Sequence, residues 1–318
     1  MVSVIPTVTG TVAPEKFGVT LMHEHVFVEY GGPSAEHCSA GPVFDRIVAA
    51  CTSVVEQLTP WGVQTVVDPT TVDLGRSVPL LCALSKKTGI AIICATGIYH
   101  AAVYRRIRSQ CGGFAGVTAL FVRELTTGID QSGVRAGIIK VVTGAPRISS
   151  DERELLEVAA RAAVVSGAPI ITHTEGVLGD EQQQILVRAG VPPDRIIIGH
   201  SCLSVDFDYH RRILDAGSYL AFDRFGMPGM LDEVRATTLY NLISAGYGSQ
   251  LMVSHDSVWH WVNGPTMGTG ACKNWKPTNF FERIIPLLRY SGITDQQIAA
   301  LLIDNPRRFF TSAGAVQS

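Results

Sequence analysis

The sequence predicts a (β/α)8 barrel, and three observations support this prediction. Seven apolar, β-branched segments recur at spacings that leave room for a helix between them, and an eighth precedes the motif His23-Glu24-His25. Their almost continuous apolar character is typical of strands that are buried on both faces of a parallel sheet. The segments between them have helical periodicity and are followed by glycines. Eight strands that alternate with helices predict a closed barrel.

The expected elements follow one another in chain order. The expected strands are 19–25, 63–69, 90–97, 137–144, 169–176, 195–201, 218–226 and 250–256. The expected helices are 43–58, 78–88, 150–166, 181–189, 208–216 and 230–245. Glycines suited to left-handed helix ends accompany them, namely Gly62, Gly89, Gly167, Gly190, Gly217 and Gly246. The alternative architecture is an open doubly wound sheet, but its glycine-rich fingerprint after the first strand is missing from the sequence.

Length and composition favour one domain. A (β/α)8 barrel commonly reaches this size as a single domain, and neither linker nor repeat interrupts residues 1–318. Residues 257–279 are rich in Gly, Trp, Asn and Pro and are expected to form one long loop after the eighth strand. Such loops build the active-site face of a barrel.

Charge and cysteine content exclude several classes of protein. The formal net charge of −2 gives no electrostatic reason to expect nucleic acid or an anionic membrane as a partner. No apolar run is long enough for a membrane span, and no secretory signal is evident at the N-terminus. The seven cysteines are scattered and show no C-x-x-C pair, which is typical of reduced thiols in a cytoplasmic protein.

Residues able to bind metal stand at the ends of several expected strands. In an extended strand His23 and His25 point to the same side, while Glu24 points to the other. Each residue alone has an ordinary structural interpretation, such as a hydrogen-bonded histidine or a capping aspartate. Because the carboxyl ends of barrel strands meet at one mouth, the whole set predicts a metal site. The set comprises His23, His25, Lys140, His173, His200 and Asp256.

Lys140 is the least expected member of this set, because a buried ammonium among imidazoles is energetically costly. A neutral amine can instead react with CO₂ to give a carbamate, which is anionic and can bridge two metals. Two ions roughly 3.5–4 Å apart would share a hydroxide of lowered pKa. Asp256 would bind one metal and accept the proton of that hydroxide.

The chain resembles the phosphotriesterase family of the amidohydrolase superfamily, and within it the phosphotriesterase-like lactonases. The matching stretches span nearly the whole chain and include 18–25, 67–76, 95–99, 139–143, 198–201, 223–226, 254–256 and 305–310. The resemblance implies that His23, His25, Lys140 and Asp256 hold a more buried metal. It implies that Lys140, His173 and His200 hold a more exposed one, with Lys140 as bridging N6-carboxylysine. Zinc is the expected metal, and cobalt, manganese or iron are alternatives. Similar proteins are commonly homodimers, so a homodimer is expected.

The resemblance also bears on the substrate, which is expected to be a small molecule, a lactone or an ester. Tyr99 and Arg224 stand where lactonase-like members carry Tyr and Arg, and both are expected to act in catalysis. Trp259 and Trp261 suit an apolar acyl chain. Lactones are therefore favoured, including N-acyl-homoserine lactones, with weak promiscuous organophosphate hydrolysis.

Several alternatives remain open at this point. The same site would serve a phosphotriesterase or a carboxylesterase. A non-catalytic zinc protein is disfavoured, because the dispersed ligands leave coordination positions open. The segment after His200 departs from the family pattern, and either Asp206 or Asp208 takes the acidic position found in relatives.

Overall fold

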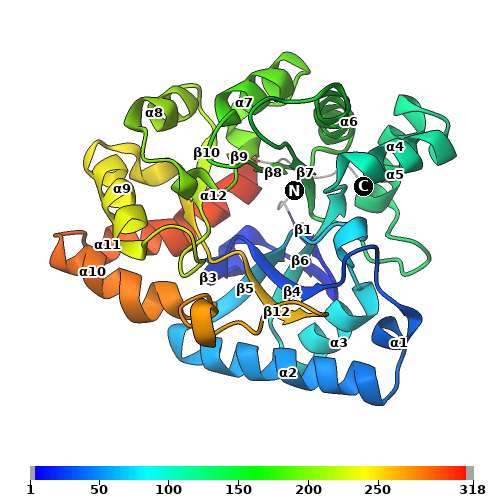
Figure 1. Cartoon of the computed structure of the whole chain (residues 1–318), viewed down its shortest axis with the longest axis horizontal. Helices are drawn as coiled ribbons and strands as arrows, with labels where there is room; N and C mark the ends of the chain where they lie inside the picture. The colour runs from blue at the N-terminus through cyan, green and yellow to red at the C-terminus, as the bar shows by residue number, and fades with distance from the viewer. Residues whose placement is uncertain (1–3, 313–318) are drawn as a thin grey trace.

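Eight parallel strands form the central sheet of the computed structural model, which describes residues 4–312. They are β3 (Val19–Leu21), β5 (Val63–Asp68), β6 (Ala91–Gly97), β7 (Ile138–Val142), β8 (Ile170–His173), β9 (Ile196–Ile198), β10 (Tyr219–Phe222) and β11 (Leu251–Val253). Each strand pairs in parallel with the next in this order. Helices surround the sheet, so the predicted (β/α)8 barrel is confirmed (Figure 1).

The six predicted helices are confirmed with boundaries within two residues. They are α2 (Pro42–Leu58), α3 (Val78–Thr88), α6 (Ser150–Ser166), α7 (Gly179–Arg188), α8 (Phe207–Asp215) and α9 (Asp232–Ser244). The remaining helices are α1 (Ala35–Cys38), α4 (Ala101–Cys111), α5 (Phe114–Thr126), α10 (Ile285–Tyr290), α11 (Asp295–Ala299) and α12 (Asn305–Ser312), with π-helical turns at Phe280–Ile284 and Ala300–Asp304. Neither α4 nor α5 was predicted from the sequence, although both pack apolar side chains against the core, among them Tyr104 of α4 and Phe121 of α5. No helix within residues 4–312 is long and apolar enough to cross a membrane.

The barrel closes beside the expected metal site through side chains and irregular backbone. The expected first strand 19–25 is in fact two strands, β3 and β4 (Glu24–Val28), because β4 leaves the main sheet to pair with β12 (Ser257–Trp261). Between β11 and β3, the His23 carbonyl accepts from the Asp256 amide at 3.0 Å. The His23 amide donates to the Ser254 hydroxyl, also at 3.0 Å.

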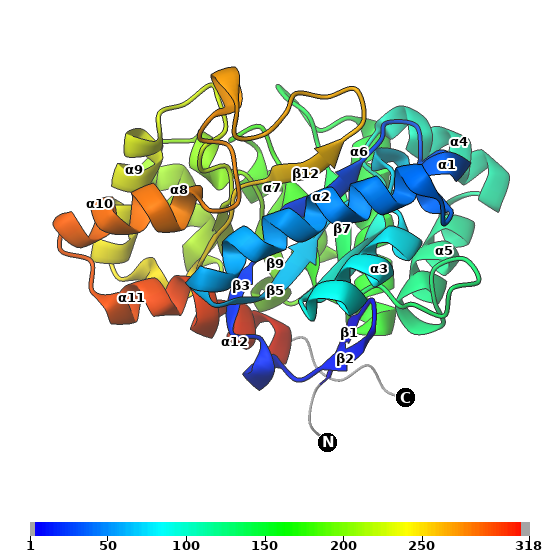
Figure 2. The same ribbon diagram turned by 90° about the horizontal axis from the view of Figure 1, so that it is seen from below.

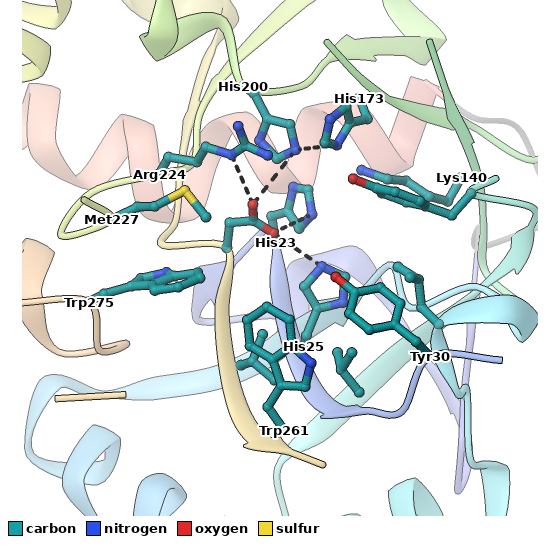
Figure 3. A pocket seen from close by; sticks show the side chains of 15 residues that line it. His23, His25, Tyr30, Lys140, His173, His200, Arg224, Met227, Trp261 and Trp275 are labelled. Carbon is teal, nitrogen blue, oxygen red and sulfur yellow. Dashed lines mark hydrogen bonds and ion pairs between the residues drawn. The ribbon is translucent and has the colours of Figure 1, made fainter. Parts of the chain in front are cut away.

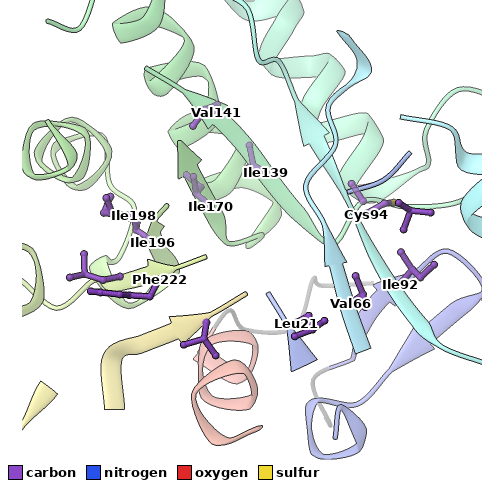
Figure 4. Packing of buried hydrophobic residues seen from close by; sticks show 14 of the residues in the cluster. Leu21, Val66, Ile92, Cys94, Ile139, Val141, Ile170, Ile196, Ile198 and Phe222 are labelled. Carbon is purple, nitrogen blue, oxygen red and sulfur yellow. The ribbon is translucent and has the colours of Figure 1, made fainter. Parts of the chain in front are cut away.

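Alternation along the strands divides the apolar residues into two groups. One packs between the sheet and the helices and includes Ile139 and Val141 of β7 (Figure 4). The other fills the barrel interior and includes Ile138 of β7 and Ile171 of β8. Two residues further along the same strands come Lys140 and His173. The polar site therefore lies directly above an apolar plug.

The prediction of one long loop over 257–279 is wrong in its first part. Residues 257–261 form β12, whose alternating bulky residues suit a pleated strand. Trp259 of this strand lies in the core rather than at the mouth. Figure 2 shows β12 and the segment after it at one end of the barrel, opposite α12 and the hairpin β1 (Ile5–Thr7) and β2 (Gly10–Val12).

Candidate metal centre

A pocket at the carboxyl ends of the strands brings together all six predicted ligands. His23, His25, Lys140, His173, His200 and Asp256 line it, together with Tyr99 and Arg224 (Figure 3). The cavity has a volume of about 110 Å³. Met227 and Trp275 lie on the side opposite Lys140 (Figure 3). Strands far apart in sequence thus place their chemically active side chains at a single mouth.

Two of the expected ligands have strained backbones. His200 and Asp256 have φ values of 57° and 52°, in the left-handed region that non-glycine residues rarely adopt. His200 follows β9, and Asp256 follows β11. Such strain costs about 1–3 kcal/mol and is concentrated at functional sites. The turn that each residue makes directs its side chain into the pocket.

Each of the four histidines has one ring nitrogen bonded outside the site. Asp223 accepts from Nδ1 of His23 at 2.7 Å and from Nδ1 of His200 at 2.9 Å. Glu175 accepts from Nε2 of His173 at 2.9 Å. Nδ1 of His25 lies 2.7 Å from the hydroxyl of Thr70, which is itself bonded to the carboxylate of Asp68. Such outer partners fix the tautomer and ring orientation of metal-binding histidines.

The other nitrogen of each ring faces inward and lies close to a second potential ligand atom. Nε2 of His200 lies 2.9 Å from Nδ1 of His173. Nε2 of His23 and Nε2 of His25 lie 3.2 and 3.1 Å from the same oxygen of Asp256. Buried Nε2 of His23 has no hydrogen-bond partner among the described residues.

The protonation of these rings suits a metal ion. Burial lowers the pKa of His173 to about 4 and that of His200 well below its ordinary value. Burial and the nearby charge of Lys140 lower the pKa of His23. A carboxylate can only accept, so these neutral rings donate outward and turn lone pairs inward. Lone pairs in such contact repel unless a cation lies between them, so the donor set fits divalent metal. The potential ligand atoms of His23, His200 and Asp256 all lie within 4.8 Å of one another.

Lys140 is almost fully buried and has no carboxylate within ion-pair distance in the described part of the chain. Its ammonium makes a single long contact, 3.4 Å from the carbonyl of Thr172. Burial lowers the pKa of Lys140 to about 8, which makes the neutral, nucleophilic amine accessible near neutral pH. Gly97 of β6 allows the close approach of this strand, because a Cβ there would lie 1.9 Å from the Lys140 carbonyl.

Asp256 joins the histidines to Arg224. Nε of Arg224 donates to Oδ2 of Asp256 at 3.0 Å. Burial would raise the pKa of the Asp256 carboxyl, but the surrounding His200, His23 and His25 and the charge of Arg224 outweigh burial and lower this pKa well below its ordinary value. Asp256 is therefore a carboxylate, available to a metal ion or to a proton.

Aromatic side chains form a large part of the remaining pocket wall. The ring of Tyr99 packs edge-on against His173 at 5.2 Å between centroids. Burial raises the pKa of Tyr99, so its phenol keeps its proton and can donate a hydrogen bond. Tyr30, Trp261 and Trp275 also line the cavity.

The structure corrects or extends several residue assignments. Trp259 was expected at an acyl-chain site but is buried in the core, and Asp206 caps helix α8 by accepting from the Tyr209 amide. His255 bonds to Glu24 and is absent from the pocket lining. The sequence reasoning missed the bonding partners Asp223, Asp68, Thr70 and Glu175 and the wall residue Tyr30. The signal for Asp223 and Glu175 was their position just beyond a strand end, β10 for Asp223 and β8 for Glu175.

Comparison with known proteins agrees with this geometry. The model described as Phosphotriesterase family matches residues 3–310. A phosphotriesterase homology protein of Mycobacterium tuberculosis is 33% identical, with 98% of each chain covered. An aryldialkylphosphatase of Saccharolobus solfataricus is also 33% identical, over 95% of this chain and 97% of that protein. A variant of a phosphotriesterase-like lactonase from Deinococcus radiodurans superposes with a TM-score of 0.89 at 37% identity, over 96% of this chain and 99% of the other.

Proposed function

This chain belongs to the phosphotriesterase family, and from that premise we propose that it is a binuclear metal-dependent lactonase. That it is a hydrolase of this family follows from its relatives, so the alternative of a non-catalytic zinc protein is wrong. Its proposed substrates are lactones, including N-acyl-homoserine lactones, with weak hydrolysis of organophosphate triesters. The similarity to a lactonase of known structure supports this choice.

The observation that carries the proposal is the small cavity beside the phenol of Tyr99. At about 110 Å³, the cavity is smaller than the roughly 300–1,000 Å³ typical of ligand pockets. That volume suits a compact ring, with any chain extending outward past Trp261. A phosphotriester carries three substituents around its tetrahedral phosphorus and needs more room near the metals.

The proposed ligand sets follow the inward-facing atoms. His23, His25 and Asp256 would hold one ion and His173 and His200 the other, with Lys140 as a bridging N6-carboxylysine. Zinc is the proposed metal, with cobalt, manganese or iron as alternatives. When bound, the two ions supply Lewis acidity and lower the pKa of a water molecule.

The protein's own residues then have distinct tasks. Asp256 accepts the proton of the attacking water, and Arg224 holds the Asp256 carboxylate in position from 3.0 Å away. Tyr99 donates a hydrogen bond to an oxygen of the lactone and orients the ring. Trp261 and Trp275 cover the apolar part of the substrate and exclude water from it.

A substrate panel on metal-loaded protein tests the proposal. It should contain γ- and δ-lactones with short and long acyl chains, open-chain esters and paraoxon-like triesters, with chelated protein as the control. We expect kcat/KM to be highest for a lactone. Faster turnover of triesters than of every lactone would favour a phosphotriesterase, as the aryldialkylphosphatase relative suggests, and fastest turnover of open esters would favour a carboxylesterase.

A further inference from the structure

Glu175 occupies a particular place among the groups that hold the histidines from outside. It follows His173 by two residues, just beyond the end of β8. Its Oε1 lies 2.9 Å from Nε2 of His173, and its Oε2 lies 3.9 Å from Nη1 of Arg224. Through Arg224, which bonds to Asp256, it belongs to a chain of charges around the pocket mouth.

Exposure distinguishes Glu175 from the other outer partners. Its side chain is 49% exposed, whereas the side chains of Asp223 and Asp68 are 0% and 1% exposed. The buried carboxylates are fixed by several bonds, since Asp223 serves two histidines and the amide of His200. The support of His173 is therefore the only one of these that solvent reaches directly.

Which ring nitrogen of His173 carries the proton decides whether His173 and His200 can both bind a cation. Nδ1 of His173 and Nε2 of His200 lie 2.9 Å apart, which is hydrogen-bonding distance. If the proton sat on Nδ1, His173 would donate it to His200, and both lone pairs would be consumed. A carboxylate at Nε2 holds the proton on the outer nitrogen and keeps the two inner nitrogens free.

We propose that Glu175 is a positioning residue that keeps His173 and His200 from hydrogen-bonding to each other and so maintains the more exposed metal position. This inference rests on the proposed function for the presence of the metals. It adds that Glu175, which is not a ligand, sets the metal affinity of one of the two positions. Its contact with Arg224 adds little, because the two atoms are 3.9 Å apart and Glu175 is half-exposed.

Metal affinity tests the inference separately from activity. We would titrate wild type, Glu175→Ala and Glu175→Gln with chelator at equilibrium and count the metal ions retained per chain. In Glu175→Ala we expect one ion to bind roughly 10–100-fold more weakly and the other to be unchanged, as is typical for loss of an outer partner. Glu175→Gln should recover part of the affinity, because its amide oxygen can still accept from Nε2. Glu157→Gln is the matched control, since Glu157 is exposed on α6.

Ring nitrogen shifts of metal-free protein give a second measurement. In wild type, the His173 proton should be on Nε2, and in Glu175→Ala it should be on Nδ1. Equal retention of both ions by wild type and Glu175→Ala, or an unchanged tautomer, would overturn the role of Glu175. If wild type itself retained no second ion, the binuclear proposal would fail instead, so the two failures are distinguishable.

Discussion

Oε1 of Glu24 lies 2.7 Å from Nδ1 of His255, and this pair joins the two ends of the barrel sheet. Glu24 stands between His23 and His25, and His255 directly precedes Asp256. The same carboxylate accepts from the hydroxyls of Ser254 and Ser257. Glu24 therefore fixes the ligands that follow β3 in position relative to Asp256, which follows β11.

Removing the Glu24 carboxylate should destabilise the fold. Glu24→Ala leaves several buried donors without an acceptor, and each costs about 1–3 kcal/mol. Denaturant unfolding of chelated protein measures the change without any contribution from metal. Glu24→Gln keeps an acceptor oxygen, so its free energy of unfolding should fall less. A Glu24→Ala variant as stable as wild type would contradict this account.

Replacing Lys140 should abolish binding of both metals. Lys140→Ala removes the proposed bridging carbamate, so metal analysis should find close to none of the ions retained by wild type. Mass analysis of intact wild type under CO₂ should show one added carboxyl group. Full activity with two metals and an unmodified lysine would refute the modification.

Asp256→Asn should keep the fold but lower kcat by about 10²–10⁴-fold, because an amide cannot accept the proton of the attacking water. Both proteins must be saturated with metal in this comparison, because partial loss of metal from the variant would also lower the measured kcat. A rate near wild type in this variant would remove Asp256 from proton transfer.

Tyr99→Phe should lower kcat/KM for lactones by about 1–2 kcal/mol, or roughly 5–30-fold, the scale of one lost hydrogen bond. Turnover of triesters, which lack the ring oxygen, should change little. An equal loss for both substrate classes would indicate that Tyr99 only packs against His173.

Two tryptophans of β12 should give opposite results. Trp261 lines the pocket, so Trp261→Ala should lower kcat/KM for long-chain lactones more than for short ones. Trp259 is buried in the core, so Trp259→Ala should lower stability by about 3–5 kcal/mol. Chain-length profiles and denaturant unfolding of both variants, compared side by side, check this division.

The sequence alone determined the barrel and the six residues at its mouth. Apolar strands of period two and helices of period 3.6 are local patterns, and parallel strands necessarily bring their carboxyl ends together. His173 and Asp256 could therefore be assigned to one site, although they follow different strands that are far apart in the sequence. Helices α4 and α5 were not predicted, although both pack apolar side chains against the core.

Only the tertiary structure decided which groups support the ligands and which aromatic residues face the substrate. The bond of Asp223 to His23 joins residues 200 positions apart, and the bond of Glu175 to His173 depends on a loop conformation. Trp259 and Trp261 are the same type of residue and stand two positions apart in the sequence. One lies in the core and the other at the pocket, although residues two apart on a regular strand point to the same side. Strand alternation therefore does not distinguish them, and only their long-range packing against the rest of the chain does.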